Sequence, residues 1–214
     1  MYNEQQAKTE MQRYGRSMFE RGLTGGASAN ISVRTATGFI ISPTNSCIGF
    51  LELHELSVLD KEGNWLSGEK PSKEFALHKA FYDQRPQDHA VVHLHSTYAT
   101  ALSCLDVPET ELFPPLTPYL YIRLGHVARV PYFSPGDQEL ADAVQAVTAS
   151  TAGVLMENHG PIVSAATLAS AMYAIEELEE SAKLTIILKN QQCRDIPSQK
   201  VNELLVKYGH KLAE

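Results

Sequence analysis

The stretch HAVVHLHSTYATAL, residues 89–102, predicts a buried strand that runs directly into a helix. Apolar and small residues lead into His93 and His95, and Ser96 or Thr97 is a candidate N-cap for the helix that follows. Side chains alternate along a strand, so the two histidines lie on one face of it. An imidazole suits a core poorly unless partners occupy its ring nitrogens. The stretch therefore raises the question of what holds these two histidines.

Strands and helices are mixed along the rest of the chain. Hydrophobic patterning predicts further strands at 31–35, 38–42, 56–60, 128–133 and 153–160. It predicts helices at 4–22, 71–84, 96–105, 136–149, 167–191 and 198–212. The proline-rich segment 107–119 is expected to be a long loop, of the kind that borders a site. This order indicates an α/β fold with helices on both faces of a sheet, in one domain spanning 1–214.

The composition restricts the classes of partner and the compartment. Hydrophobic residues make up 43% and charged residues 20%, which is typical of a globular protein. The net charge of −7 argues against nucleic acid or an anionic membrane as the main partner. Three unpaired cysteines, no signal sequence and no membrane-length apolar run indicate a soluble, cytoplasmic protein with reduced thiols.

Three histidines are candidate metal ligands. His93 and His95 share a strand face, where two neutral imidazoles can bind one divalent ion. His159 ends another predicted strand and precedes Gly160, at the kind of strand end where active-site groups gather. The residues alone leave the alternative open that each histidine only donates to a backbone carbonyl or caps a turn.

The segment KPSKE, residues 70–74, could bind phosphate. The Ser72 hydroxyl, the Lys73 ammonium and backbone N–H groups at a helix start are all suitable donors. Glu74 could complete a three-histidine metal site or act as a base, and His78, four residues later on the same helical face, competes as a metal ligand. The alternative is an ordinary helix start.

Two turns offer further donors for an anion. Asn30 lies in TGGASANIS, and Thr44 and Asn45 lie in SPTNS. Both segments are equally typical of plain turns.

Taken in order, the motifs ASANISVR, ISPTNS, KPSKE, VVHLHS and ENHG resemble the class II aldolase/adducin family over roughly residues 4–190. That resemblance implies a central mixed or antiparallel sheet flanked by helices. It implies metal ligands at Glu74, His93, His95 and His159, with Zn2+ as the usual ion and Glu74 also as the catalytic carboxylate. It places a phosphate pocket at Asn30, Thr44, Asn45, Ser72 and Lys73.

The same resemblance implies how chains assemble. The family forms fourfold homotetramers with sites between subunits. A tyrosine from the neighbouring subunit aligns best with Tyr119, and Tyr121 is the alternative.

Within the family, the motifs together with PPLTPY and VPYFSPGD are most similar to those of 3-oxo-tetronate 4-phosphate decarboxylases. Ala29-Asn30, Thr44-Asn45 and Ser72-Lys73 depart from the sugar-phosphate aldolase pattern, and a cation at Lys73 suits a substrate with a phosphate and a carboxylate. The expected reaction is decarboxylation to dihydroxyacetone phosphate through a zinc-stabilised enediolate. The alternatives are a class II aldolase or 4-epimerase acting on fuculose or ribulose phosphate, and a non-catalytic adducin-like module.

Overall fold

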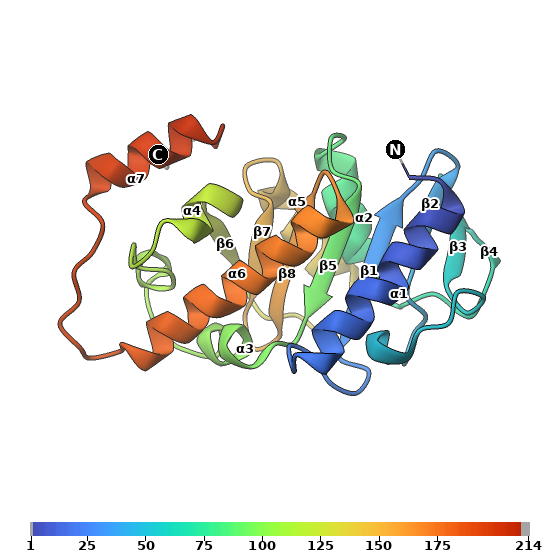
Figure 1. The fold of residues 1–214 in the computed structure, drawn as a ribbon, viewed down its shortest axis with the longest axis horizontal. Coiled ribbons are helices and arrows are strands. Elements are labelled where there is room, and N and C mark those ends of the chain that lie inside the picture. The colour runs from blue at the N-terminus through green and yellow to red at the C-terminus, as the bar shows by residue number, and fades with distance from the viewer. Residues whose placement is uncertain (1, 211–214) are drawn as a thin grey trace.

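An eight-stranded sheet forms the middle layer of the molecule (Figure 1). The computed structural model describes residues 2–210, and the strand order in the sheet is β4-β3-β2-β1-β5-β8-β7-β6. Neighbouring strands are antiparallel, except that β6 and β7 are parallel. The strands are β1 (Ala29–Arg34), β2 (Gly38–Ile41), β3 (Ser57–Asp60), β4 (Trp65–Ser67), β5 (Ala90–Leu94), β6 (Val127–Val130), β7 (Gly153–Met156) and β8 (Gly160–Ala165).

Helices cover both faces of this sheet. In Figure 1, α1 and α6 cross the near face and α2 and α5 lie behind it, while α4 and α7 extend beyond the β6 edge. The α-helices are α1 (Glu4–Glu20), α2 (Phe75–Gln84), α3 (Thr97–Ser103), α4 (Tyr119–Arg123), α5 (Gln138–Thr148), α6 (Leu168–Ile187) and α7 (Ser198–Lys207). Two short 3-10 helices are η1 (Ile48–Phe50) and η2 (Glu109–Glu111).

The alternation of β5 decides which core each of its residues enters. Ala90, Val92 and Leu94 belong to the hydrophobic cluster beneath α1 and α6. Val91 belongs to the second cluster, with residues of α2 and α5. Because side chains two apart share a face, His93 lies on the α2 side of the sheet. The strand that the sequence predicted at 89–95 therefore delivers a fully buried histidine toward α2.

Most predicted elements are present, with a few differences. The helix predicted from Pro71 begins at Phe75, because Pro71 instead forms an isolated bridge with Pro43. The strand predicted at 128–133 ends at Val130. Two strands and one α-helix were not predicted, namely β4, β8 and α4, and neither were the two short 3-10 helices. The helix predicted at 198–212 is α7, and residues 211 and 212 lie outside the described range. None of the helices in 2–210 combines the length and apolarity needed to cross a membrane.

Candidate metal centre

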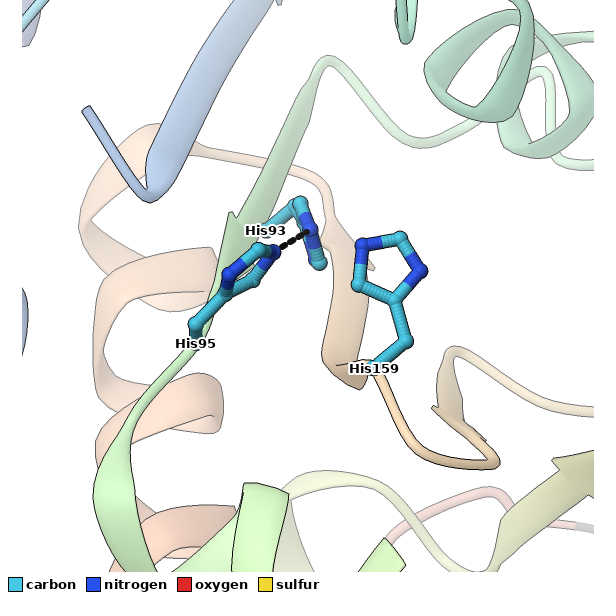
Figure 2. A group of neighbouring side chains, drawn as sticks. All are labelled: His93, His95 and His159. Atoms are coloured by element: carbon cyan, nitrogen blue, oxygen red, sulfur yellow. Dashed lines mark hydrogen bonds between the residues drawn. The ribbon is translucent and has the colours of Figure 1, made fainter. Parts of the chain in front are cut away.

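Three histidine side chains converge where β5 ends and β7 turns into β8 (Figure 2). Their candidate ligand nitrogens, on His93, His95 and His159, all lie within 4.8 Å of one another. The Nε2 atoms of His93 and His95 are 3.0 Å apart. Two ring nitrogens that close need a proton or a cation between them. His93 and His159 are buried and His95 is exposed, so the group opens toward solvent on the His95 side.

The turn between β7 and β8 places His159 in this group. Asn158 adopts a left-handed conformation with φ of 54°, and Gly160 has φ of 146°. A Cβ at Gly160 would lie 2.7 Å from the carbonyl oxygen of Leu94, so only glycine allows β8 to start this close to the end of β5. The requirement for glycine after His159 is therefore steric. The close approach of β8 to the end of β5 brings His159 against His93.

The donor set fits a divalent metal ion. His93 Nδ1 donates to the carbonyl oxygen of Pro161 at 2.8 Å, which leaves Nε2 unprotonated and directed at the other two rings. Both ring nitrogens of His159 are buried without a hydrogen-bond partner among the described residues. Leaving such nitrogens unpaired is costly, and three imidazole nitrogens are a common zinc donor set. Burial also lowers the pKa of His93 and of His95, which keeps both neutral as metal binding requires.

Glu74 lies beside two of these histidines. It is the N-cap residue of α2 and is only 7% exposed. Its Oε1 is 3.5 Å from His159 Nε2 and its Oε2 is 3.7 Å from His93 Nε2. Burial would raise the pKa of Glu74, but its contacts with His159 and His93 and a hydrogen bond from Asn30 lower it well below its usual range. Glu74 therefore places an ionised carboxylate next to the three-histidine group.

His78, the competing ligand candidate, does not join the group. Its Nε2 is hydrogen-bonded to Asn30 Oδ1 at 2.5 Å, and its Nδ1 to Ser32 Oγ at 2.7 Å. Asn30 Nδ2 in turn donates to Glu74 Oε2 at 2.7 Å, and Ser32 Oγ lies 2.8 Å from the Tyr82 hydroxyl. The spacing of Glu74 and His78 indicated a shared helical face, and that is where they lie. Asn30 was expected at a phosphate, yet its amide contacts Glu74 and His78.

The loops expected to bind phosphate lie side by side. Thr44 N–H donates to the Lys70 carbonyl at 2.9 Å, and Ser72 N–H donates to the Ser42 carbonyl at 3.3 Å. From the sequence, these two N–H groups were candidate donors to an anion, but both already donate to backbone carbonyls. The Ser72 hydroxyl accepts from Glu74 N–H at 3.3 Å. Side chains rather than these amides remain for a ligand.

Lys73 and Asn45 are the accessible members of the expected phosphate pocket. Both are exposed, and Asn45 has a left-handed φ of 56°. The aliphatic part of Lys73 passes Gly136, where a Cβ would lie 3.5 Å from Lys73 Cδ. Thr44 and Asn45 also line a cavity of about 450 Å³, which Lys70 borders. The loop pair thus presents the cations Lys70 and Lys73 and several polar side chains, and Lys73 directly precedes Glu74.

The two tyrosine candidates differ in their surroundings. Tyr119, at the start of α4, is 59% exposed. Tyr121 is partly buried, and its hydroxyl donates to the Phe113 carbonyl of its own chain at 3.2 Å. Tyr119 is therefore the better placed of the two to contact another molecule.

Glu179 is a residue near the site that the sequence did not single out. This buried carboxylate on α6 accepts from Ser96 Oγ at 2.7 Å, Tyr98 N–H at 2.9 Å and Ala99 N–H at 2.7 Å. It thus caps α3 directly after His95, in place of the predicted side-chain cap by Ser96. A polar residue inside the apolar face of the helix 167–191 was the signal available in the sequence.

This combination of fold and site defines a family. Residues 9–186 match the Class II Aldolase and Adducin N-terminal domain, and the chain belongs to that family, as its motifs indicated. Among curated relatives, the 3-oxo-tetronate 4-phosphate decarboxylase of Escherichia coli strain K12 is 42% identical over 203 residues, covering 94% of this chain and 96% of the relative. The enzyme of the same name from Cupriavidus necator is 41% identical over 191 residues, covering 89% and 88%.

Solved structures agree on the fold. YgbL from Klebsiella pneumoniae superposes with a TM-score of 0.91 at 40% identity, covering 95% of this chain and all of that one. An L-fuculose 1-phosphate aldolase superposes with a TM-score of 0.83 at 30% identity, covering 95% and 96%. The expected three-layer fold with a mixed sheet is confirmed.

Proposed function

We propose that this chain is a 3-oxo-tetronate 4-phosphate decarboxylase that releases CO2 and dihydroxyacetone phosphate. The observation that carries the proposal is the three-histidine group with a buried, ionised Glu74 beside it, in a chain about 41% identical to relatives of that name. A binding module would have no need of such a donor set, which disfavours the adducin-like alternative.

The substrate is a β-keto acid, so its C1–C2 bond can break with the electron pair passing toward the C3 ketone. A divalent cation, Zn2+ in our proposal, held by His93, His95 and His159 with Glu74, supplies Lewis-acid stabilisation of the negative charge that develops at C3. Protonation of the resulting enediolate at C2 completes dihydroxyacetone phosphate. The reaction consumes one proton for each CO2 released.

Glu74 is the proposed carrier of that proton. Its low pKa makes it a carboxylate at rest. In the proposed step it accepts a proton from solvent and passes it to C2. The hydrogen bond from Asn30 holds Oε2, and Oε1 remains on the His159 side. Tyr119 of a neighbouring subunit is the second proposed donor.

The proposed phosphate pocket consists of Thr44, Asn45, Ser72 and Lys73, with Asn30 at its inner side. Lys73 adds a cation that can meet a phosphate or a carboxylate. This favours a substrate with two anionic ends over a plain sugar phosphate. The proposal also includes a homotetramer, in which Tyr119 reaches the site of the next chain.

A substrate panel tests the proposed reaction. The purified protein, loaded with Zn2+, is assayed for CO2 and dihydroxyacetone phosphate from both stereoisomers of 3-oxo-tetronate 4-phosphate. Fuculose 1-phosphate and ribulose 5-phosphate are the competing substrates, since the aldolase similarity at 30% identity makes aldol cleavage the second candidate. We expect the highest kcat/KM for a 3-oxo-tetronate 4-phosphate. Aldehyde release from fuculose 1-phosphate without decarboxylation would reject the proposal.

Metal analysis tests the site independently of the substrate. Elemental analysis of the purified protein is expected to find about one Zn2+ per chain, since each chain offers one three-histidine group. A protein with His93→Ala and His95→Ala should lose that metal and keep its fold. Full folding and full activity after exhaustive chelation would contradict the assignment.

A further inference from the structure

A line of polar side chains is buried between β1 and α2 and ends at Glu74. From the far end it runs Tyr82, Ser32, His78, Asn30 and Glu74, with successive contacts of 2.8, 2.7, 2.5 and 2.7 Å. Ser32 and His78 are completely buried, and Asn30 is 6% exposed. A core site of this kind is more easily filled with apolar side chains, so a fully paired polar line there calls for a reason.

The chemistry of the groups fixes the direction of every hydrogen bond. Asn30 Oδ1 can only accept, so His78 Nε2 carries the ring proton and donates to it. The neutral ring then accepts at Nδ1, where the donor is the Ser32 hydroxyl. Since that hydroxyl donates its only hydrogen to His78 Nδ1, it accepts from the Tyr82 hydroxyl. All donors therefore point toward Glu74.

The consequence falls on the Asn30 amide. With Oδ1 held by His78, the amide cannot turn over, and Nδ2 must face the Glu74 carboxylate. A turned amide would put its oxygen against the ionised Oε2, which is repulsive. The ionised Oε2 thus decides which end of Asn30 faces it, and His78 holds the other end of the amide in place. Together the two contacts fix where Asn30 and Oε2 lie. The other oxygen, Oε1, is left 3.5 Å from His159.

The sequence builds this line from two periodicities. In ANISVR, Asn30 and Ser32 are two apart on β1 and share the face opposite Ile31 and Val33. Glu74, His78 and Tyr82 are spaced by four along the start and body of α2. Across the sheet, Asn30 pairs directly with His93 of β5, so the line ends within the metal centre.

We propose that Asn30 and His78 are positioning residues, which hold the Glu74 carboxylate in the orientation that serves both the metal and the proton transfer. This deepens the proposed function and rests on it. In this proposal the main role of Asn30 is to position Glu74 rather than to bind the phosphate.

The test compares two substitutions of His78. His78→Leu removes both hydrogen bonds and frees the Asn30 amide, whereas a glutamine at this position can still donate to Asn30 Oδ1. Outer-shell partners typically contribute about 10- to 100-fold to metal affinity, and misplacing a reacting group by about 1 Å costs about 100-fold in rate. For His78→Leu we expect Zn2+ affinity and kcat each to fall at least about tenfold. His78→Gln should restore most of both, with KM unchanged throughout.

Thr148→Val is the matched control, because it also removes a buried hydrogen bond to α2. Thr148 is fully buried and its hydroxyl donates to the Ala80 carbonyl of α2, away from Glu74. The Thr148→Val variant should have a lower free energy of unfolding, while its Zn2+ affinity and kcat stay unchanged. Ser32→Ala provides a milder break in the line, and it should lower Zn2+ affinity and kcat about threefold without disturbing the fold. This variant carries the test if His78→Leu does not fold.

The measurements separate this proposal from the proposed reaction. Zn2+ affinity, from competition with a chelator, needs no substrate, so it tests the positioning role even if no decarboxylation is seen. Unchanged Zn2+ affinity and kcat in Ser32→Ala and His78→Leu would overturn it. For Asn30→Ala we expect the same loss of kcat and Zn2+ affinity, with competitive inhibition by inorganic phosphate retained. A large loss of that inhibition at unchanged kcat would instead make Asn30 a phosphate ligand.

Discussion

Glu74 is the single residue on which the proposed chemistry depends most. It is buried, ionised and in contact with His93, His159 and Asn30. Glu74→Gln keeps an oxygen for Asn30 but cannot carry a proton, so we expect kcat to fall roughly 100- to 10,000-fold. Steady-state kinetics check this, and inhibition by inorganic phosphate should change less than about twofold. Glu157→Gln, which removes a partly buried carboxylate paired with Arg129, is the control. An unchanged rate in Glu74→Gln would contradict the proton-transfer role.

His78 gives the metal-free protein a pH dependence of stability. Burial lowers the pKa of His78 to about 4, against an opposing effect of Glu74, while the unfolded value is 6.5. Between these values only the unfolded state binds the proton, so stability falls as the pH falls from about 6.5 to about 4. The loss attributable to His78 is roughly 3 kcal/mol. Urea unfolding of the wild type against His78→Gln measures it, and parallel pH curves for the two proteins would reject it.

The three histidines and Glu74 were foreseeable from local patterns, but the contacts of His78 were not. Strand alternation placed His93 and His95 on one face, and the glycine after His159 marked a turn. What the spacing alone could not decide was whether His78 competes with them. That depends on Asn30 and Ser32, which are more than forty residues away in sequence and meet His78 only through the packing of α2 on β1. Local patterns contain no information about such contacts.

At the scale of elements, α6 and α3 are joined through one carboxylate. Glu179 accepts three hydrogen bonds at the start of α3, the helix that follows His95. Glu179→Gln replaces one acceptor by an amide donor facing N–H groups, and we expect a loss of about 2–4 kcal/mol in unfolding free energy. Zn2+ affinity should also fall, since His95 directly precedes the loosened turn. Glu176→Gln, which removes an ion pair to the half-exposed Arg21, should cost under about 1 kcal/mol. Equal losses for the two variants would contradict the capping role.

The elements that patterning missed have identifiable reasons. Strand β8 begins at Gly160 and Pro161, which are typical of a strand end, but here the Pro161 carbonyl accepts from His93 and no donor is needed from its nitrogen. Helix α4 has five residues, too few to show a helical period. The start of α2 was placed too early because the Pro43–Pro71 bridge overrides the preference of proline for a first helical turn. The misses at β8 and α2 thus reflect tertiary contacts, and the miss at α4 reflects its length.

At the scale of the whole molecule, one sheet contributes to both hydrophobic clusters. Strands β5, β7 and β8 place alternate residues in each cluster, for example Val92 and Val163 in one and Val91 and Ile162 in the other. Because the two clusters share these strands, unfolding of the strands would expose the apolar residues of both clusters at once. This supports the proposal of one domain over 1–214. Chemical unfolding of the metal-loaded protein is expected to give one transition by fluorescence and by circular dichroism. Two separated transitions would indicate independent units.

Assembly is the level at which Tyr119 can be tested. If each site combines Glu74 of one chain with Tyr119 of the next, Glu74→Gln and Tyr119→Phe tetramers are each nearly inactive, yet together they can build intact sites. Random exchange of subunits at equal amounts restores about a quarter of the sites in a cyclic arrangement, since each intact site needs Glu74 from a Tyr119→Phe chain and Tyr119 from a neighbouring Glu74→Gln chain. The measurement is the rate recovered after dissociation and reassembly of the mixture.

The control for this experiment exchanges subunits without restoring a site. It mixes Glu74→Gln with the double variant Glu74→Gln/Tyr119→Phe, and co-purification of differently tagged chains reports that exchange has taken place. Recovery of about a quarter of the wild-type rate only in the first mixture would place Tyr119 across the interface. Exchange without recovery would assign Tyr119 to its own chain or to no role. Because the Tyr121 hydroxyl is already engaged by Phe113, Tyr121→Phe should give no such complementation.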